Sequence, residues 1–99
     1  MTVSKEQVLS ALESVVDPEM GINIVDLGLV YGVKVEERLV SVDLTLTTPR
    51  CPLAGAIAAE AEQAVRQVAD PDDHVEIVFV WDPPWTPDRM SDEARSHFG

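Results

Sequence analysis

Apolar residues recur at helical spacing near the start of the chain. Ser4 and Gln7 match the capping-box pattern, in which two side chains satisfy backbone groups at a helix start. The apolar positions that follow form one stripe, made of Val8, Leu9, Leu12, Val15 and Val16. This pattern predicts a helix over about residues 5–16. It should end there because the residue before Pro18 avoids the helical conformation.

Residues 17–28 break the helical spacing but stay apolar. Gly21 and Asn23 are typical loop residues, whereas Ile22, Ile24 and Leu27 are too apolar for a solvated linker. We therefore expect an ordered loop that packs on the core, with one short helical turn near residues 24–27.

Alternating apolar and polar residues then predict two strands. The first covers residues 29–36, and Glu37-Arg38 connects it tightly to a second strand at about residues 39–47. Helical spacing returns from Leu53 and predicts a helix to about Ala69. Pro52 suits its first position, where a missing N–H costs nothing.

A third strand is predicted at residues 75–81. Val75, Ile77, Phe79 and Trp81 share one face, and Val78 and Val80 lie on the other, which predicts at least partial cover on both sides. Residues 82–87 hold three prolines and cannot join a regular element. Ser91 is expected to cap a short final helix.

The predicted order is therefore α-β-β-α-β-α within a single domain, residues 1–99. A hairpin followed by a strand–helix–strand crossover gives a small α/β (α+β) fold with a mixed three-stranded sheet packed with helices. The crossover makes the third strand parallel to the second. The pattern leaves open which strand the third one pairs with.

Charge changes the picture of possible partners. The net charge is -11, from 18 acidic and 7 basic residues, so nucleic acid and anionic membranes are poor partners. No apolar run approaches the roughly 20 residues that span a bilayer. The N-terminus has no secretory pattern, and we expect a cytoplasmic protein.

Cys51 is the only cysteine, and it stands where the strand pattern changes to the helix pattern. Free N–H groups and the positive end of the helix dipole at that point favour a thiolate, as does Arg50. The alternative is a small buried apolar residue. One thiol cannot complete a four-ligand iron–sulfur or zinc site, so no permanently bound cofactor is expected. Transient iron or cluster binding through Cys51 would need a second subunit, a carboxylate or an external thiol.

Other side chains offer weaker signals. Asp17, Glu19 and Asp26 could share a proton or bind a cation, or Asp17 could cap a turn and Asp26 a short helix. His74 and His97 lack metal-ligand spacing and are expected to be solvated. Trp81 and Trp85 bracket a proline pair, which is typical either of a protein-binding surface or of a lid over a small core.

The same residues carry a family resemblance. The chain resembles the SufT/PaaD-type iron–sulfur (metal–sulfur) cluster assembly family in Asp17-Pro18-Glu19, residues 23–30, residues 46–52, and Pro83-Pro84-Trp85 followed by Met90-Ser91. The resemblance implies a small α/β domain that helps to mature iron–sulfur proteins, with Cys51 as the functional thiol. It carries the Asp-Pro-Glu motif over to Asp17 and Glu19. We expect Asp26, Thr48 and Arg50 to be supporting residues of the same pocket.

Three functions follow as hypotheses. The first is a stand-alone, SufT-like accessory factor, not an enzyme, that works with iron–sulfur assembly proteins and apo client proteins. A homodimer would bring two Cys51 thiols together. The second is an adaptor without metal chemistry, such as a PaaD-like oxygenase subunit, docking through Trp81 and Trp85. PaaD-type members add a cysteine-rich C-terminal region that this sequence lacks. The third, a small thiol enzyme, has no visible base.

Overall fold

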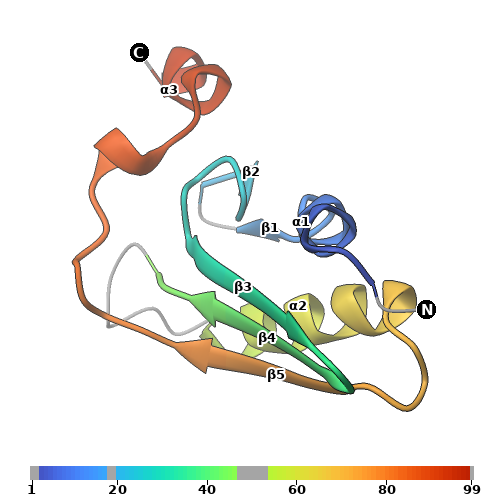
Figure 1. Ribbon diagram of the computed structural model, residues 1–99. Coiled ribbons are helices and arrows are strands. Elements are labelled where there is room, and N and C mark those ends of the chain that lie inside the picture. Colours follow the sequence, from blue (N-terminus) through green and yellow to red (C-terminus); the bar gives the residue numbers. More distant parts are fainter. Residues whose placement is uncertain (1–2, 18–19, 47–53, 99) are drawn as a thin grey trace.

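A mixed sheet of three strands organises the fold (Figure 1). The computed structural model describes residues 3–17, 20–46 and 54–98. The described chain runs in the order α1 (Lys5–Leu12), β1 (Val16–Asp17), β2 (Ile22–Asn23), β3 (Val30–Glu36), β4 (Leu39–Leu44), α2 (Ala54–Val68), β5 (His74–Phe79), a 3-10 helix (Pro87–Arg89) and α3 (Asp92–Phe98).

The predicted α+β class and the mixed sheet are confirmed, and the pairing left open by the sequence is resolved. The strand order is β3-β4-β5, so β4 is central. β3 and β4 form the predicted antiparallel hairpin, turning at Arg38, whose φ is 62°. β5 runs parallel to β4 and pairs Val40 with Val75 and Leu44 with Phe79. The helix α2 makes the crossover between them.

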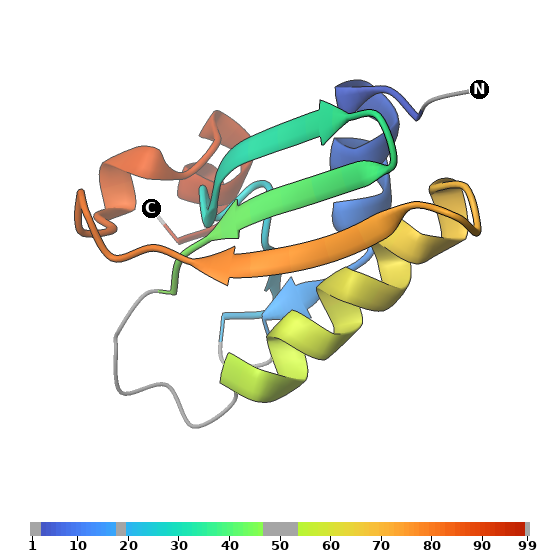
Figure 2. The same cartoon turned by 60° about the horizontal axis from the view of Figure 1, so that its bottom comes forward.

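The core lies between the sheet and the helices α1 and α2, which cover the same face (Figure 2). Val40, Val42 and Leu44 point into it from the central strand and are fully buried. Alternate residues of β4 therefore define an inner face, and Ser41 and Asp43 lie on the opposite, outer face. Val78, on the outer face of β5, is 40% exposed. The expectation of at least partial cover on both sides is met only in part, because Val80, directly after β5, is partly buried whereas Val78 is more exposed.

The first helix is shorter than predicted. It begins at the Ser4–Gln7 capping box, as expected, but ends at Leu12 instead of residue 16. The Ser14 hydroxyl donates to the Ala11 carbonyl at 2.7 Å, a local bond that competes with continued helix. Val16 and Asp17 then form β1, which pairs antiparallel with β2. This small second sheet was not predicted, because strands of two residues leave too short a pattern.

The other boundaries differ by a few residues. β4 ends at Leu44 and β5 at Phe79, so both predicted strands were too long, although the Val80 N–H still donates to the Leu44 carbonyl. α2 ends at Val68, one residue before the expected end, and its predicted start at Pro52 lies outside the described residues. Ser91 caps α3 as predicted, since its hydroxyl accepts from the Ala94 N–H at 3.2 Å. None of the described helices has the length and apolar character needed to cross a membrane.

The loop after β2 holds the C-terminal part of the chain in place. It contains the predicted helical turn, in which the Leu27 N–H donates to the Asn23 carbonyl at 3.0 Å. Gly28 follows with φ at +78°. A Cβ atom at Gly28 would lie 2.1 Å from the Arg89 carbonyl oxygen. Only glycine therefore allows the Pro87–Arg89 turn to pack so closely here.

We expect Gly28→Ala to destabilise the fold strongly, and Gly21→Ala is its matched control. Both residues have positive φ, but a Cβ at Gly21 meets nothing within 4 Å. Gly21→Ala should lower the free energy of unfolding by about 1–2 kcal/mol through backbone strain alone. Gly28→Ala should cost roughly 1–3 kcal/mol more because the Arg89 backbone must move. Urea unfolding measures both, and equal losses would contradict the close packing.

Candidate functional site

Four of the residues predicted to be functional, Glu19, Thr48, Arg50 and Cys51, lie outside the described residues. The structure does describe what flanks residues 47–53 in sequence, namely the end of β4 on one side and the start of α2 at Ala54 on the other. β4 and β5 are parallel, so their carboxyl ends lie at the same edge of the sheet. The carboxyl edge of parallel strands is where ligands bind in open α/β sheets.

The two tryptophans differ in their surroundings. Trp81 follows β5 at this carboxyl edge, is 45% exposed, and stacks on Phe79 with ring centroids 6.0 Å apart. Trp85 is partly buried and packs against the core. Its Nε1–H donates to the Leu27 carbonyl at 2.7 Å. Of the two roles that the sequence left open, covering the core fits Trp85, whereas the ring of Trp81 is available at the surface.

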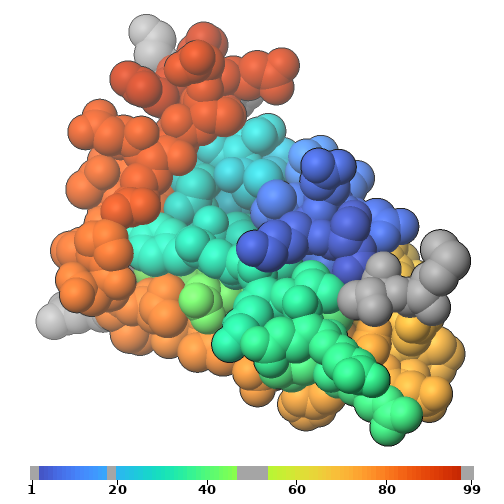
Figure 3. All heavy atoms as spheres, in the orientation of Figure 1, coloured from blue at the N-terminus to red at the C-terminus, as the bar shows by residue number. Residues whose placement is uncertain are grey.

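Several contacts fasten residues 83–91 to the segment from Asp26 to Tyr31. The Tyr31 hydroxyl donates to the Pro83 carbonyl at 2.7 Å, and the Arg89 guanidinium lies 4.5 Å from the Tyr31 ring centroid. The Ser91 N–H donates to the Asp26 carbonyl at 2.7 Å. Figure 3 shows this orange-to-red segment lying directly against the cyan loop. These bonds, with the Gly28 contact, fix the path that the chain takes after Trp81.

Asp26 is held by the turn that it belongs to. Asn23 is the capping residue, because its Oδ1 accepts from the N–H groups of Val25 and Asp26 at 3.0 and 2.9 Å. Asn23 Nδ2 donates to Asp26 Oδ2 at 2.9 Å. The alternative in which Asp26 caps a short helix is therefore replaced by a cap from Asn23. One carboxylate oxygen of Asp26 is engaged within the loop.

Asp17 occupies a buried position on β1. Asp17 is only 2% exposed. Its side-chain Oδ1 accepts from the Met20 N–H at 3.4 Å, and its backbone carbonyl accepts from the Gly21 N–H at 2.8 Å. These bonds close the turn between β1 and β2, which matches the turn-capping alternative. Asp17 is not among the residues that line the hollow beside Asp26.

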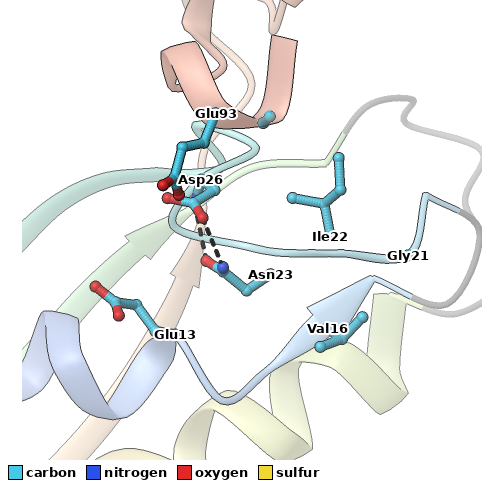
Figure 4. Close-up of a pocket in the computed structure, with 8 residues that line it drawn as sticks. Glu13, Val16, Gly21, Ile22, Asn23, Asp26 and Glu93 are labelled. Atoms are coloured by element: carbon cyan, nitrogen blue, oxygen red, sulfur yellow. Dashed lines mark hydrogen bonds between the residues drawn. The ribbon is translucent and has the colours of Figure 1, made fainter. Parts of the chain in front are cut away.

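The hollow beside Asp26 is an open concavity of the described surface (Figure 4). It has a volume of about 360 Å³, and the carboxylates of Glu13, Asp26 and Glu93 line it together with Val16 and Ile22. The described residues that line it include no lysine or arginine, so this part of the hollow is electronegative. Within the described ranges, no group of three His, Cys, Asp or Glu side chains could hold a metal ion.

Of the two histidines, the structure describes the side chain of His74 only. The His74 side chain is 68% exposed, as predicted, and lies 3.9 Å from Glu76. His97 belongs to α3, and the surroundings of its side chain lie outside what the structure describes.

Sequence reasoning missed the lining residues Glu13 and Glu93. They lie far apart in sequence, and no local pattern links them. It also missed the capping role of Asn23, for which a signal existed, since asparagine is a favoured capping residue before an apolar turn.

Comparison with known proteins identifies relatives over almost the whole chain. Residues 5–78 match the model of a family described as iron-sulfur cluster assembly protein. The chain is 46% identical to the Fe-S protein maturation auxiliary factor YitW of Bacillus subtilis, covering 96% of this chain and 93% of YitW. It is 43% identical to the auxiliary factor SufT of Staphylococcus aureus, covering 86% of this chain and 97% of SufT.

A solved structure shows the same fold. The crystal structure of a domain of unknown function from Bacillus anthracis is 37% identical to this chain and superposes with a TM-score of 0.88. The match covers 96% of this chain and 91% of the other. The described architecture is therefore that of an experimentally observed domain.

The contrast between the tryptophans predicts different costs for the same substitution. Trp85→Phe keeps an aromatic ring but removes the N–H that bonds to Leu27, leaving a part-buried carbonyl without its donor. We expect a loss of about 1–3 kcal/mol in the free energy of unfolding. Trp81→Phe, at an exposed ring, should stay within about 0.5 kcal/mol of wild type. Urea unfolding of both variants measures these losses, and a larger loss for Trp81→Phe than for Trp85→Phe would refute the assignment.

Proposed function

Because this chain belongs to the iron–sulfur cluster assembly protein family, we propose that it is an accessory factor in the maturation of iron–sulfur proteins and that Cys51 is the group that handles the cargo. The observation that carries the proposal is positional. The only cysteine of the chain lies, in sequence, between β4 and α2. This connecting segment begins at the carboxyl end of β4, at the edge of the sheet where the parallel strands β4 and β5 both end. In this fold, that edge is where a ligand is expected.

The start of a helix favours the reactive form of a thiol. Unpaired N–H groups and the helix dipole stabilise negative charge near the first turn. α2 begins at Ala54, three positions after Cys51 in sequence, and Arg50 adds a positive charge next to the thiol. A lowered thiol pKa would increase the thiolate fraction, and the thiolate is the form that binds iron. This is the role that we assign to Cys51.

One thiolate makes the interaction with iron or a cluster transient. An iron–sulfur cluster is usually held by four thiolates, and this chain supplies one. The remaining ligands would come from a client protein, an external thiol or the Cys51 of a second copy. Incomplete ligation suits an accessory factor, because cargo that is weakly held can be passed on. We assign Asp17, Glu19, Asp26, Thr48 and Arg50 a supporting role around this site.

The exposed ring of Trp81 supports a docking role at the same edge. A large aromatic side chain that remains 45% exposed is typical of the residues that dominate protein interfaces. Assembly proteins and apo clients that dock on Trp81 would meet the chain where β4 and β5 end. The same observation favours the second candidate function, an adaptor in which Trp81 binds partners and Cys51 carries no cargo.

Anaerobic reconstitution separates these two functions. The protein would be incubated with ⁵⁷Fe and sulfide, desalted, and examined by visible absorption and Mössbauer spectroscopy. We expect a cluster signal in wild type and its loss in Cys51→Ala, because no other thiol exists in the chain. Trp81→Ala is the matched control and should keep the signal. A signal that survives in Cys51→Ala would contradict the assignment, and none in either protein would favour the adaptor.

A further inference from the structure

β5 has an outer edge that pairs with no strand of the described chain. It lies at the border of the sheet, with β4 on its other side (Figure 1). The N–H groups of His74 and Val80 donate to β4 and its flanks, to the carbonyls of Arg38 and Leu44. Backbone groups alternate along a strand, so the even-numbered residues face β4. The N–H and C=O groups of Val75, Ile77 and Phe79 therefore face outward.

The opposite border of the sheet is protected in a way that β5 is not. β3 has a register shift between Val30 and Gly32, and it carries Lys34. Bulges and lysines are common devices that stop an edge strand from pairing with another chain. β5 keeps an unbroken register over its six residues and contains no proline, glycine, lysine or arginine. Its edge is suited to accept a further strand.

The sequence on both sides of β5 is acidic, although the backbone of Arg38 adjoins its first residue, His74. Between Arg66 and Arg89 the sequence holds no lysine or arginine, but it holds the acidic residues Asp70, Asp72, Asp73, Glu76, Asp82 and Asp88. Glu76 lies within β5, with its side chain 45% exposed. A second copy of this chain, with a net charge of -11, would be repelled from such an edge. A basic segment would be attracted.

We propose that the outer edge of β5 binds an extended, basic segment of a partner protein as an added strand. Backbone bonds to Val75, Ile77 and Phe79 would supply the affinity, as in other cases of strand addition. Cationic side chains of the added strand would lie beside Glu76 on the outer face, with their methylene stems along Val78. Its alternate apolar side chains would extend the inner face beside Ile77 and Phe79, which are partly buried against the core. This interaction is independent of the role proposed for Cys51.

Amide hydrogen exchange with a defined probe tests the proposal. The probe is a blocked octapeptide of alternating lysine and valine, added to the full chain at low salt and followed by NMR. We expect exchange at Val75, Ile77 and Phe79 to slow by about tenfold or more near saturation, because each N–H gains a hydrogen bond. The N–H of Val78 already faces β4 and should change little. A peptide of alternating glutamate and valine should not bind measurably.

Two variants distinguish strand addition at β5 from general attraction to an acidic protein. Val78→Lys places a positive charge on the outer face of β5 and should weaken binding of the lysine–valine peptide by about tenfold. Val16→Lys is the matched control. Val16 is also an exposed valine in a strand, 46% exposed where Val78 is 40% exposed, but it lies on β1. This control should change the affinity by less than about twofold. If Val78→Lys fails to fold, Glu76→Gln replaces it, with an expected weakening of about threefold.

Several outcomes would overturn the proposal. The proposal is wrong if the lysine–valine peptide does not bind, or if it binds without slowing exchange at Val75, Ile77 and Phe79. It is also wrong if Val16→Lys weakens peptide binding as much as Val78→Lys does, or if the glutamate–valine peptide binds as tightly as the lysine–valine peptide. Concentration-dependent protection of the same amides without peptide would overturn it too, because a second copy would then occupy the edge.

Discussion

The parallel pairing of β4 with β5 is the constraint on which the rest of the structure depends. Two adjacent parallel strands cannot be joined by a tight turn, so a crossover, here α2, must connect them. Their alignment places Leu44 opposite Phe79, and both strands end at the same edge of the sheet. The sequence segments that follow them carry Cys51 and Trp81. The segments that carry the two candidate functional residues therefore begin at the same edge of the sheet.

The loop after β2 has a structural role that its composition reflects. Ile24, Leu27 and Leu29 are fully buried, and the backbone between them presents carbonyls to the C-terminal segment. Gly28 allows that segment to approach closely. We infer that most of residues 23–28 serve to fix the path of the chain beyond Trp81, and that Asn23 and Asp26 also line the hollow.

Much of the fold could be predicted because its signals are local. Alternation marked β3, β4 and β5, a capping box marked the start of α1, and the crossover required parallel strands. The extension of α1 to Val16 failed because the pairing of Val16 with Asn23 is a tertiary interaction that overrides helical spacing. The site was harder to predict. Cys51 stood out as the only thiol, but the hydrogen bond from Trp85 to Leu27 joins residues that lie far apart in sequence.

The most direct test of the central claim is complementation in cells that lack their own protein of this family. The measured quantity is the activity of an iron–sulfur enzyme, normalised to its amount. The account predicts that wild type and Trp81→Phe restore the activity, whereas Cys51→Ser is produced in folded form at a wild-type level and does not. Full restoration by Cys51→Ser would show that the thiol is dispensable and would contradict the account.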